Sequence, residues 1–140
     1  MEENFEVFKY EAIFGIAPGY NNNVSNDFDV VKYFSEIWSR QAKRCFDETG
    51  VYISAVISEC NVVYNVDWGC PEGGERCVKI ECCPNPAFME SREDVVKYQD
   101  ALYSIILRVK KELKQETVSM QKIPVSNYYY YKKDGGLFIW

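Results

Sequence analysis

The pattern that most constrains the fold is a strand–helix–strand arrangement of apolar residues that occurs twice. The first copy runs from Phe5 to about Ser58, and the second runs from Arg76 to about Ile123. In each copy, a long segment with apolar residues three and four positions apart lies between segments that alternate apolar and polar residues. The first spacing is typical of an amphipathic helix and the second of a strand. We therefore predict an α+β fold with the order β-α-β-β-α-β.

Both predicted helices have recognisable ends. A residue in the range Ser25–Asp27 can cap the first helix, because short polar side chains accept backbone N–H groups there. This helix should end near Asp47, before Gly50. Ser91 begins a sequence that resembles a capping box, and the second helix should continue to about Lys114.

The predicted sheet has four strands, followed by a hairpin. The four strands are expected within Glu6–Ala17, Val51–Val66, Arg76–Cys83 and Thr117–Ile123. Tyr128–Tyr131 and Leu137–Trp140 form the hairpin, because the residues between them tolerate the backbone of a tight turn. This order is the ferredoxin-like arrangement, in which both helices cover one face of an antiparallel sheet and leave the other open. We expect a single domain with a core of about residues 5–123 and an appended hairpin of about residues 125–140.

Composition agrees with a packed domain. The chain has 140 residues, of which 47% are hydrophobic, and a domain of this size can bury a sizeable core without metal or disulfide staples. No segment has the length and apolar character of a membrane span, and none resembles a secretory signal. We therefore expect no membrane association, a cytoplasmic location and reduced thiols.

The negative charge is concentrated at the start of the chain. The formal net charge is −5, and residues 1–36 contain seven acids and two bases. This acidic quarter is either a solvated face or a surface for a basic protein partner. With a pI near 4.8 and no basic-aromatic strand, the chain is not expected to bind nucleic acid.

Two features argue against conventional catalysis. The chain has no histidine, which is the commonest general base and metal ligand. Four of the six cysteines lie between positions 70 and 83, but they do not form the two Cys-x₂₋₄-Cys pairs that are typical of a zinc site. We therefore predict no metal, no cofactor and free thiols, with a disulfide from Cys60 to Cys77 or Cys83 as the alternative.

Three carboxylates form the one candidate acid–base or ligand-binding group. Asp67, Glu72 and Glu75 lie in the loop between the second and third strands, beside Trp68. They could approach one another at the open sheet face and serve a small enzyme or a small-molecule binder. The alternative is that they are ordinary solvated loop acids.

The aromatic hairpin is the main candidate for a partner contact, because tyrosine and tryptophan are enriched at protein interfaces. Together with the acidic start of the chain, it supplies these candidate contact residues: Tyr128, Tyr129, Tyr130, Tyr131, Phe138, Trp140, Asp27 and Asp29. Self-assembly into a homo-oligomer through the same hairpin is an alternative.

Two short motifs resemble a known group of proteins. The Leu-x-Gln-Glu-x-Val turn within Val109–Met120 is similar to the end of the second helix in small ferredoxin-like proteins from phages and mobile elements of Firmicutes. Tyr10–Gly15 is similar to their first strand. The resemblance implies a protein without an assigned activity, in a group that includes anti-CRISPR-type inhibitors of host defence.

We therefore interpret the chain as a non-enzymatic protein-binding module, for which a host nuclease is a candidate target. Two alternatives stay open. One is a small-molecule binder or small enzyme that uses the loop carboxylates, and the other is a self-assembling structural protein.

Overall fold

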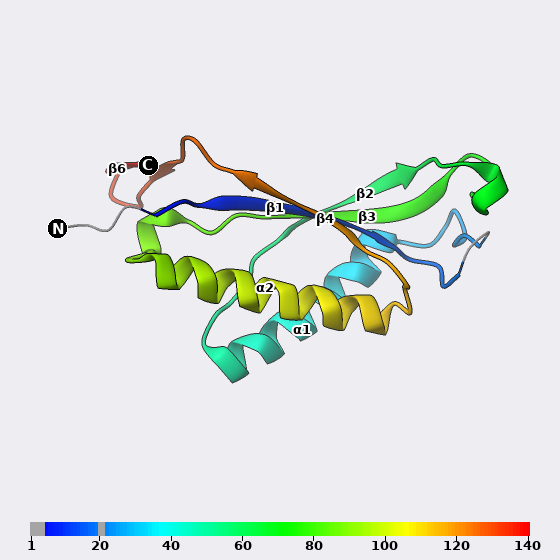
Figure 1. Cartoon of the computed structure of the whole chain (residues 1–140), viewed down its shortest axis with the longest axis horizontal. Helices are drawn as coiled ribbons and strands as arrows, with labels where there is room; N and C mark the ends of the chain where they lie inside the picture. The colour runs from blue at the N-terminus through cyan, green and yellow to red at the C-terminus, as the bar shows by residue number, and fades with distance from the viewer. Residues whose placement is uncertain (1–4, 20–21) are drawn as a thin grey trace.

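The computed structural model describes residues 5–19 and 22–140, which form a four-stranded antiparallel sheet, two long helices and a C-terminal hairpin (Figure 1). The sheet and helices are β1 (Phe8–Gly15), α1 (Val30–Thr49), β2 (Val56–Val62), β3 (Glu75–Cys82), α2 (Arg92–Glu112) and β4 (Ser119–Pro124). The hairpin consists of β5 (Tyr129–Tyr131) and β6 (Leu137–Ile139). This architecture confirms the predicted fold class and element order.

The strand order β2-β3-β1-β4 places β1 and β3 at the centre of the sheet. Glu11 of β1 lies opposite Glu81 of β3 on one side and Gln121 of β4 on the other. Because side chains alternate between faces along a strand, Tyr10 and Ala12 point toward the helices while Glu11 points the other way. Both helices lie on the same side of the sheet (Figure 1), so the second face is left open.

The core lies between the sheet and the two helices. Phe14 of β1 and Phe34 of α1 are fully buried, with ring centroids 5.0 Å apart. Ile80 of β3 and Leu102 of α2 are also fully buried in this cluster. Each side chain of this size contributes roughly 1.5–3 kcal/mol by leaving water, and the helix stripes and strand alternation in the sequence anticipate this core.

The start of α1 differs from the prediction. Its N-cap is Asp29, whose carboxylate accepts the backbone N–H of Lys32 at 3.0 Å, and not a residue in the range Ser25–Asp27. The Arg76 guanidinium donates to the backbone carbonyls of Ser25 and Phe28, at 2.5 and 2.9 Å. Residues 25–28 therefore form a turn held by β3, and the helix begins after that turn.

Other boundaries shift by a few residues. β2 begins at Val56 and β4 at Ser119, later than the predicted starts. Ser91 is the N-cap of α2 as predicted, but its side chain makes no capping hydrogen bond. The Asp94 carboxylate instead accepts the backbone N–H of Glu90 at 2.8 Å.

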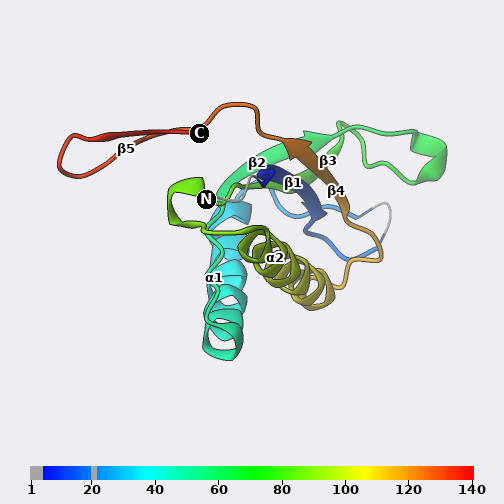
Figure 2. The ribbon, with the colours of Figure 1, turned by 60° about the vertical axis from the view of Figure 1, so that its left-hand side comes forward.

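The hairpin projects sideways from the body of the protein (Figure 2). Its inner face is held by aromatic contacts: the ring of Tyr130 lies 5.6 Å from that of Phe88, and the ring of Trp140 lies 4.8 Å from that of Phe5. Tyr129 and Tyr131 on the outer face are 60% and 73% exposed. The outer face is therefore free for a contact, which stays a prediction.

Candidate functional site

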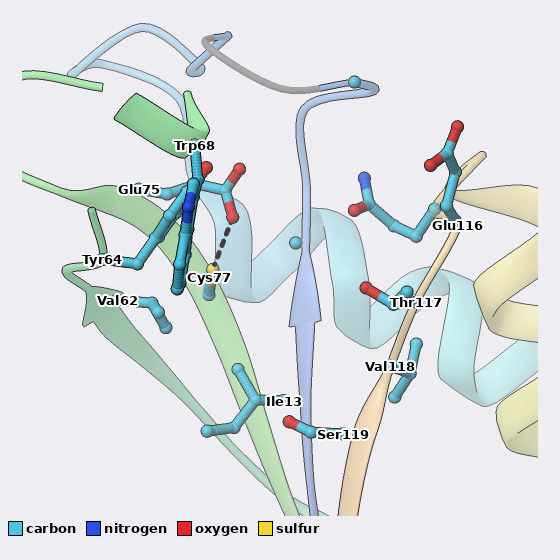
Figure 3. A pocket seen from close by; sticks show the side chains of 13 residues that line it. Ile13, Val62, Tyr64, Trp68, Glu75, Cys77, Glu116, Thr117, Val118 and Ser119 are labelled. Atoms are coloured by element: carbon cyan, nitrogen blue, oxygen red, sulfur yellow. Dashed lines mark hydrogen bonds between the residues drawn. The ribbon is translucent and has the colours of Figure 1, made fainter. Parts of the chain in front are cut away.

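A cavity of about 430 Å³ lies at one end of the open sheet face (Figure 3). One wall is formed by part of residues 60–77, a segment that we call the arm and that contributes Val62, Tyr64, Trp68, Glu75 and Cys77 to the lining. The arm contains the end of β2, the start of β3 and the connection between them, including the short 3₁₀ helix η1 (Val66–Trp68). The opposite wall is residues 115–119, which follow α2 and end at the first residue of β4, and the floor is the end of β1. The arm extends past the ends of both helices (Figures 1 and 2).

An acid and a thiol meet on the arm. The Cys77 thiol donates to Oε2 of Glu75 at 3.2 Å, and Figure 3 shows the Glu75 carboxylate pointing into the cavity. Burial raises the pKa of the Cys77 thiol, and the hydrogen bond to Glu75 raises it further. Cys77 therefore stays protonated and acts as a donor that orients the carboxylate, since only a thiolate is a good nucleophile.

The opposite wall begins with Gln115, which follows the end of α2. Lys114 adopts a left-handed backbone with φ 55°, a conformation that costs a non-glycine residue about 1–3 kcal/mol. The backbone N–H of Gln115 bonds to the Lys110 carbonyl at 3.1 Å, which closes the helix. This turn directs the Gln115 side chain toward the end of β1.

The Gln115 carboxamide is fixed over Gly15. Its Nε2 donates to the backbone carbonyl of Ala17 at 2.9 Å. A Cβ atom at Gly15 would lie 2.5 Å from Gln115 Oε1 and 3.3 Å from Glu75 Oε2. Gly15 thus leaves the space in which two oxygen acceptors from opposite walls, Gln115 and Glu75, come together. This pair is suited to a ligand with N–H donors or positive charge.

Aromatic side chains complete the arm side of the cavity. The Trp68 side chain is 71% exposed. Its backbone belongs to η1, a short helix capped by Asn65, whose side chain accepts the backbone N–H of Asp67 at 2.9 Å. The Tyr64 hydroxyl donates to the Gly69 carbonyl at 3.3 Å. Both residues line the cavity, so a planar or cationic ligand would meet aromatic faces there.

Charged side chains on the central strands β1 and β3 neutralise one another on the open face beyond the cavity. Lys9 and Lys79 contact Glu11 at 3.0 and 3.6 Å, and the same two lysines contact Glu81 at 3.7 and 3.3 Å. The pKa of Glu11 is lowered, first by its hydrogen bond from Lys9. This network leaves the end of the sheet near Gly15 as the better place for a ligand.

The structure separates the predicted loop acids. Glu75 lines the cavity, whereas Asp67 and Glu72 are exposed side chains elsewhere on the arm. Sequence reasoning missed Cys77 and Gln115 as site residues. The Leu-x-Gln-Glu-x-Val turn was a signal for Gln115, but its contact with Gly15 depends on a pairing of distant segments.

The predicted partner-contact residues differ in exposure and in structural role. Asp29 caps α1, whereas Asp27 is exposed in the preceding turn. Tyr128, Tyr130, Phe138 and Trp140 are partly buried, in contrast to Tyr129 and Tyr131.

All six cysteines are free thiols. Within residues 5–19 and 22–140, no cluster of three or more cysteine or acidic side chains is arranged to hold a metal ion. Neither helix in this described part of the chain is long and apolar enough to cross a membrane.

Comparison with known proteins gives one family match and similar solved structures. The family model described as SAM lyase matches residues 6–131. A phage SAM lyase in complex with S-methyl-5'-thioadenosine has a TM-score of 0.52 and 10% identity, covering 99% of this chain and 92% of that one. A phage SAM lyase in the apo state has a TM-score of 0.53 and 14% identity, covering 99% and 93%. At these identities the two structures show a shared fold. No curated protein sequence matches the chain.

These comparisons correct the functional interpretation of the sequence. The predicted likeness to phage proteins agrees with the two phage structures, but the family match is to an enzyme. The prediction of a non-enzymatic, anti-CRISPR-type inhibitor that binds a host nuclease is therefore wrong. The lack of histidine removes the commonest general base, but it does not exclude an enzyme whose reaction needs none.

Proposed function

Because this chain belongs to the SAM lyase family, we propose that it cleaves S-adenosylmethionine in the cavity between the arm and residues 115–119. The expected sulfur-containing product is S-methyl-5'-thioadenosine, the molecule bound in one of the similar phage structures. The observation that carries this assignment is the convergence of the Glu75 carboxylate and Gln115 Oε1 above Gly15, beside an exposed tryptophan.

The cavity suits the size and chemistry of this substrate. Its volume of about 430 Å³ falls within the roughly 300–1,000 Å³ typical of small-molecule sites. S-adenosylmethionine has a planar adenine, a sulfonium cation and an amino-acid end with an ammonium group. Trp68 and Tyr64 offer aromatic faces to the adenine or the cation. Glu75 and Gln115 offer acceptors to the ammonium group.

The reaction requires little proton transfer by the protein. The bond between sulfur and the γ carbon of the amino-acid part breaks, and its electron pair stays on sulfur. The leaving group is a neutral thioether, so it needs no general acid. This is consistent with a chain that has no histidine.

The remaining four-carbon fragment can then be completed in two ways without water. Its own carboxylate can bond to the γ carbon, which gives homoserine lactone. Alternatively, it loses a proton from the β carbon to a base such as Glu75, which gives 2-aminobut-3-enoate. In both routes, holding the amino-acid end in one orientation lowers the barrier, because the reacting groups are already in place.

The test is to incubate the full chain with S-adenosylmethionine and follow the products by liquid chromatography and mass spectrometry from the earliest times. We expect S-methyl-5'-thioadenosine together with either the lactone or the alkene. Glu75→Gln should lower kcat/KM by about 10- to 150-fold, the equivalent of about 1.5–3 kcal/mol for a hydrogen bond to a charged group.

The matched controls are Asp67→Asn and Glu72→Gln, which alter exposed acids on the same arm. Both should keep wild-type activity. Absence of S-methyl-5'-thioadenosine with the wild-type chain would refute the proposal. So would solvent ¹⁸O in homoserine at the earliest time points, because that result indicates hydrolysis. Equal losses in all three variants would show that Glu75 has no special role.

A further inference from the structure

Cys60 and Cys77 lie directly opposite each other on the open sheet face. The β2–β3 register pairs these two residues, between the pairs Glu59–Val78 and Asn61–Arg76. Side chains of directly opposed residues in an antiparallel pair share one face, with Cα atoms about 4.5–5.5 Å apart. A disulfide requires Cα atoms about 4.4–6.8 Å apart. The two strands therefore hold these thiols at a separation that a disulfide can span.

Only one of the two thiols belongs to the cavity. Cys77 lines it and donates to Glu75 at 3.2 Å. Cys60 is half-buried on the neighbouring strand β2, directly opposite Cys77, and it does not line the cavity. Oxidation of the pair would take away the hydrogen that Cys77 donates to Glu75. The oxidation state of Cys60, which lies outside the cavity, would thus decide whether the Glu75 carboxylate inside the cavity keeps its hydrogen bond from Cys77.

We propose that Cys60 and Cys77 form a thiol–disulfide exchange site for a low-molecular-weight disulfide such as glutathione disulfide, and that their oxidation inactivates the Glu75 site. The inactivation rests on the proposed lyase function, whereas the exchange itself does not.

The exchange balances with glutathione disulfide as the oxidant. The more accessible Cys60 loses its proton to solvent and attacks one sulfur of glutathione disulfide. The S–S bond breaks, and one glutathione leaves and takes up a proton. Cys77 then passes its proton to Glu75 and attacks the Cys60 sulfur. The bond between Cys60 and glutathione breaks, and the second glutathione leaves and takes up the proton from Glu75. Two protein thiols are oxidised, and one glutathione disulfide is reduced to two thiols.

The environment of the pair favours slow exchange that becomes faster as pH rises. Burial raises the pKa of Cys60, and burial together with Glu75 raises that of Cys77, so little thiolate exists at neutral pH. Cys45 and Cys82 are buried in the core on the opposite side of the sheet. These two thiols are not positioned to compete.

The test uses the reduced full chain in buffers of increasing glutathione disulfide. After acid quenching and alkylation, trypsin releases Cys77 in the tripeptide 77–79 and Cys60 in the peptide 45–76. We expect these peptides to become linked through Cys60, with the loss of two hydrogen atoms, and to separate on reduction. S-methyl-5'-thioadenosine release should fall by at least about tenfold in parallel, because Glu75 loses a charge-assisted hydrogen bond, and should recover on reduction.

Two variants separate the exchange from its effect. Cys60→Ser should stay active in the oxidising buffer and form no link to the tripeptide. Cys83→Ser, which alters another half-buried thiol, should become linked and inactive as the wild type does. Failure of Cys60 to link to Cys77 would overturn the proposal, and a linked protein with full activity would overturn the inactivation. If the reduced protein cleaves no S-adenosylmethionine, the lyase proposal fails. The exchange is still tested independently, by the mass of the peptides linked through Cys60 and Cys77.

Discussion

Replacing Gly15 with alanine would introduce a methyl group where the two walls of the cavity approach each other. The backbone at Gly15 does not have a positive φ, so alanine is acceptable there on conformational grounds. The difficulty is space, because the new Cβ would lie 2.5 Å from Gln115 Oε1 and 3.1 Å from Gln115 Cδ. Gln115 must therefore retreat, and in doing so it loses its hydrogen bond to the Ala17 carbonyl.

The expected change in stability is small and has two opposing parts. Loss of the hydrogen bond costs about 0.5–1.5 kcal/mol, and crowding at a packed site adds about 1 kcal/mol. Replacing glycine by alanine restores about 0.4–1 kcal/mol, because the unfolded chain becomes less flexible. The net loss is about 1 kcal/mol, which corresponds to a fall of about 3 °C in Tm for a chain of this length. Activity should fall further, by about tenfold, because both acceptors are displaced.

A double-mutant cycle provides the assay. Thermal unfolding followed by circular dichroism would compare Gly15→Ala in the wild-type and Gln115→Ala backgrounds, with S-methyl-5'-thioadenosine release measured in parallel. In the Gln115→Ala background both contacts with Gln115 are absent and only the contact of 3.3 Å with Glu75 Oε2 remains, so Gly15→Ala should be close to neutral. Gly136→Ala in the hairpin is the control, because its Cβ would meet mainly the exposed Asp134 side chain at 3.1 Å. Equal destabilisation in both backgrounds would refute the predicted contact.

Two further predictions test the core and the arm. Tyr10, whose hydroxyl donates to Gln99 at 3.0 Å, has its pKa raised from 10.0 to about 12, chiefly by burial. The unfolded chain therefore releases this proton first, and stability should fall as pH rises from about 10 to 12. Tyr10→Phe should lower the free energy of unfolding by about 1 kcal/mol at neutral pH and make it fall less steeply between pH 10 and 12. Denaturant unfolding at several pH values measures this dependence. A variant whose free energy of unfolding falls as steeply with pH as that of the wild type would contradict the prediction. On the arm, Trp68→Ala should raise the Kd for S-adenosylmethionine, measured by titration calorimetry, by about two- to thirtyfold. Val66→Ala, at an equally exposed position of η1, should leave this Kd unchanged. Equal effects of the two substitutions would argue against an aromatic contact.

The fold could be read from the sequence because its determinants are local and periodic. Tyr10, Ala12 and Phe14 recur at every second position of β1, with Glu11 breaking the apolar run, and the structure buries all three against the helices. The apolar stripe of α1 was equally clear. In contrast, the start of α1 depends on hydrogen bonds from Arg76 to residues 25–28. Those bonds join segments about fifty residues apart, and no local pattern encodes them.

The site was only partly predictable for the same reason. The sequence indicates Glu75 because this residue lies in an acidic loop beside a tryptophan, and the structure places it at a cavity. Gln115 reaches Gly15 only because β1 and the end of α2 meet in space, and because Lys114 takes a left-handed backbone. The functional prediction failed at a chemical step: absence of histidine excludes many mechanisms, but not the departure of a neutral thioether.

The alternation of side chains along β3 divides one strand between two independent tasks. Cys77 faces the cavity, and the next residue, Val78, is fully buried against the helices. Changes at the cavity-facing positions can therefore alter ligand preference without loosening the core, and changes at the core-facing positions can adjust stability without touching the ligand. Such a strand allows specificity to drift while the fold is preserved, which agrees with a chain that keeps the shape of phage proteins at only 10–14% identity.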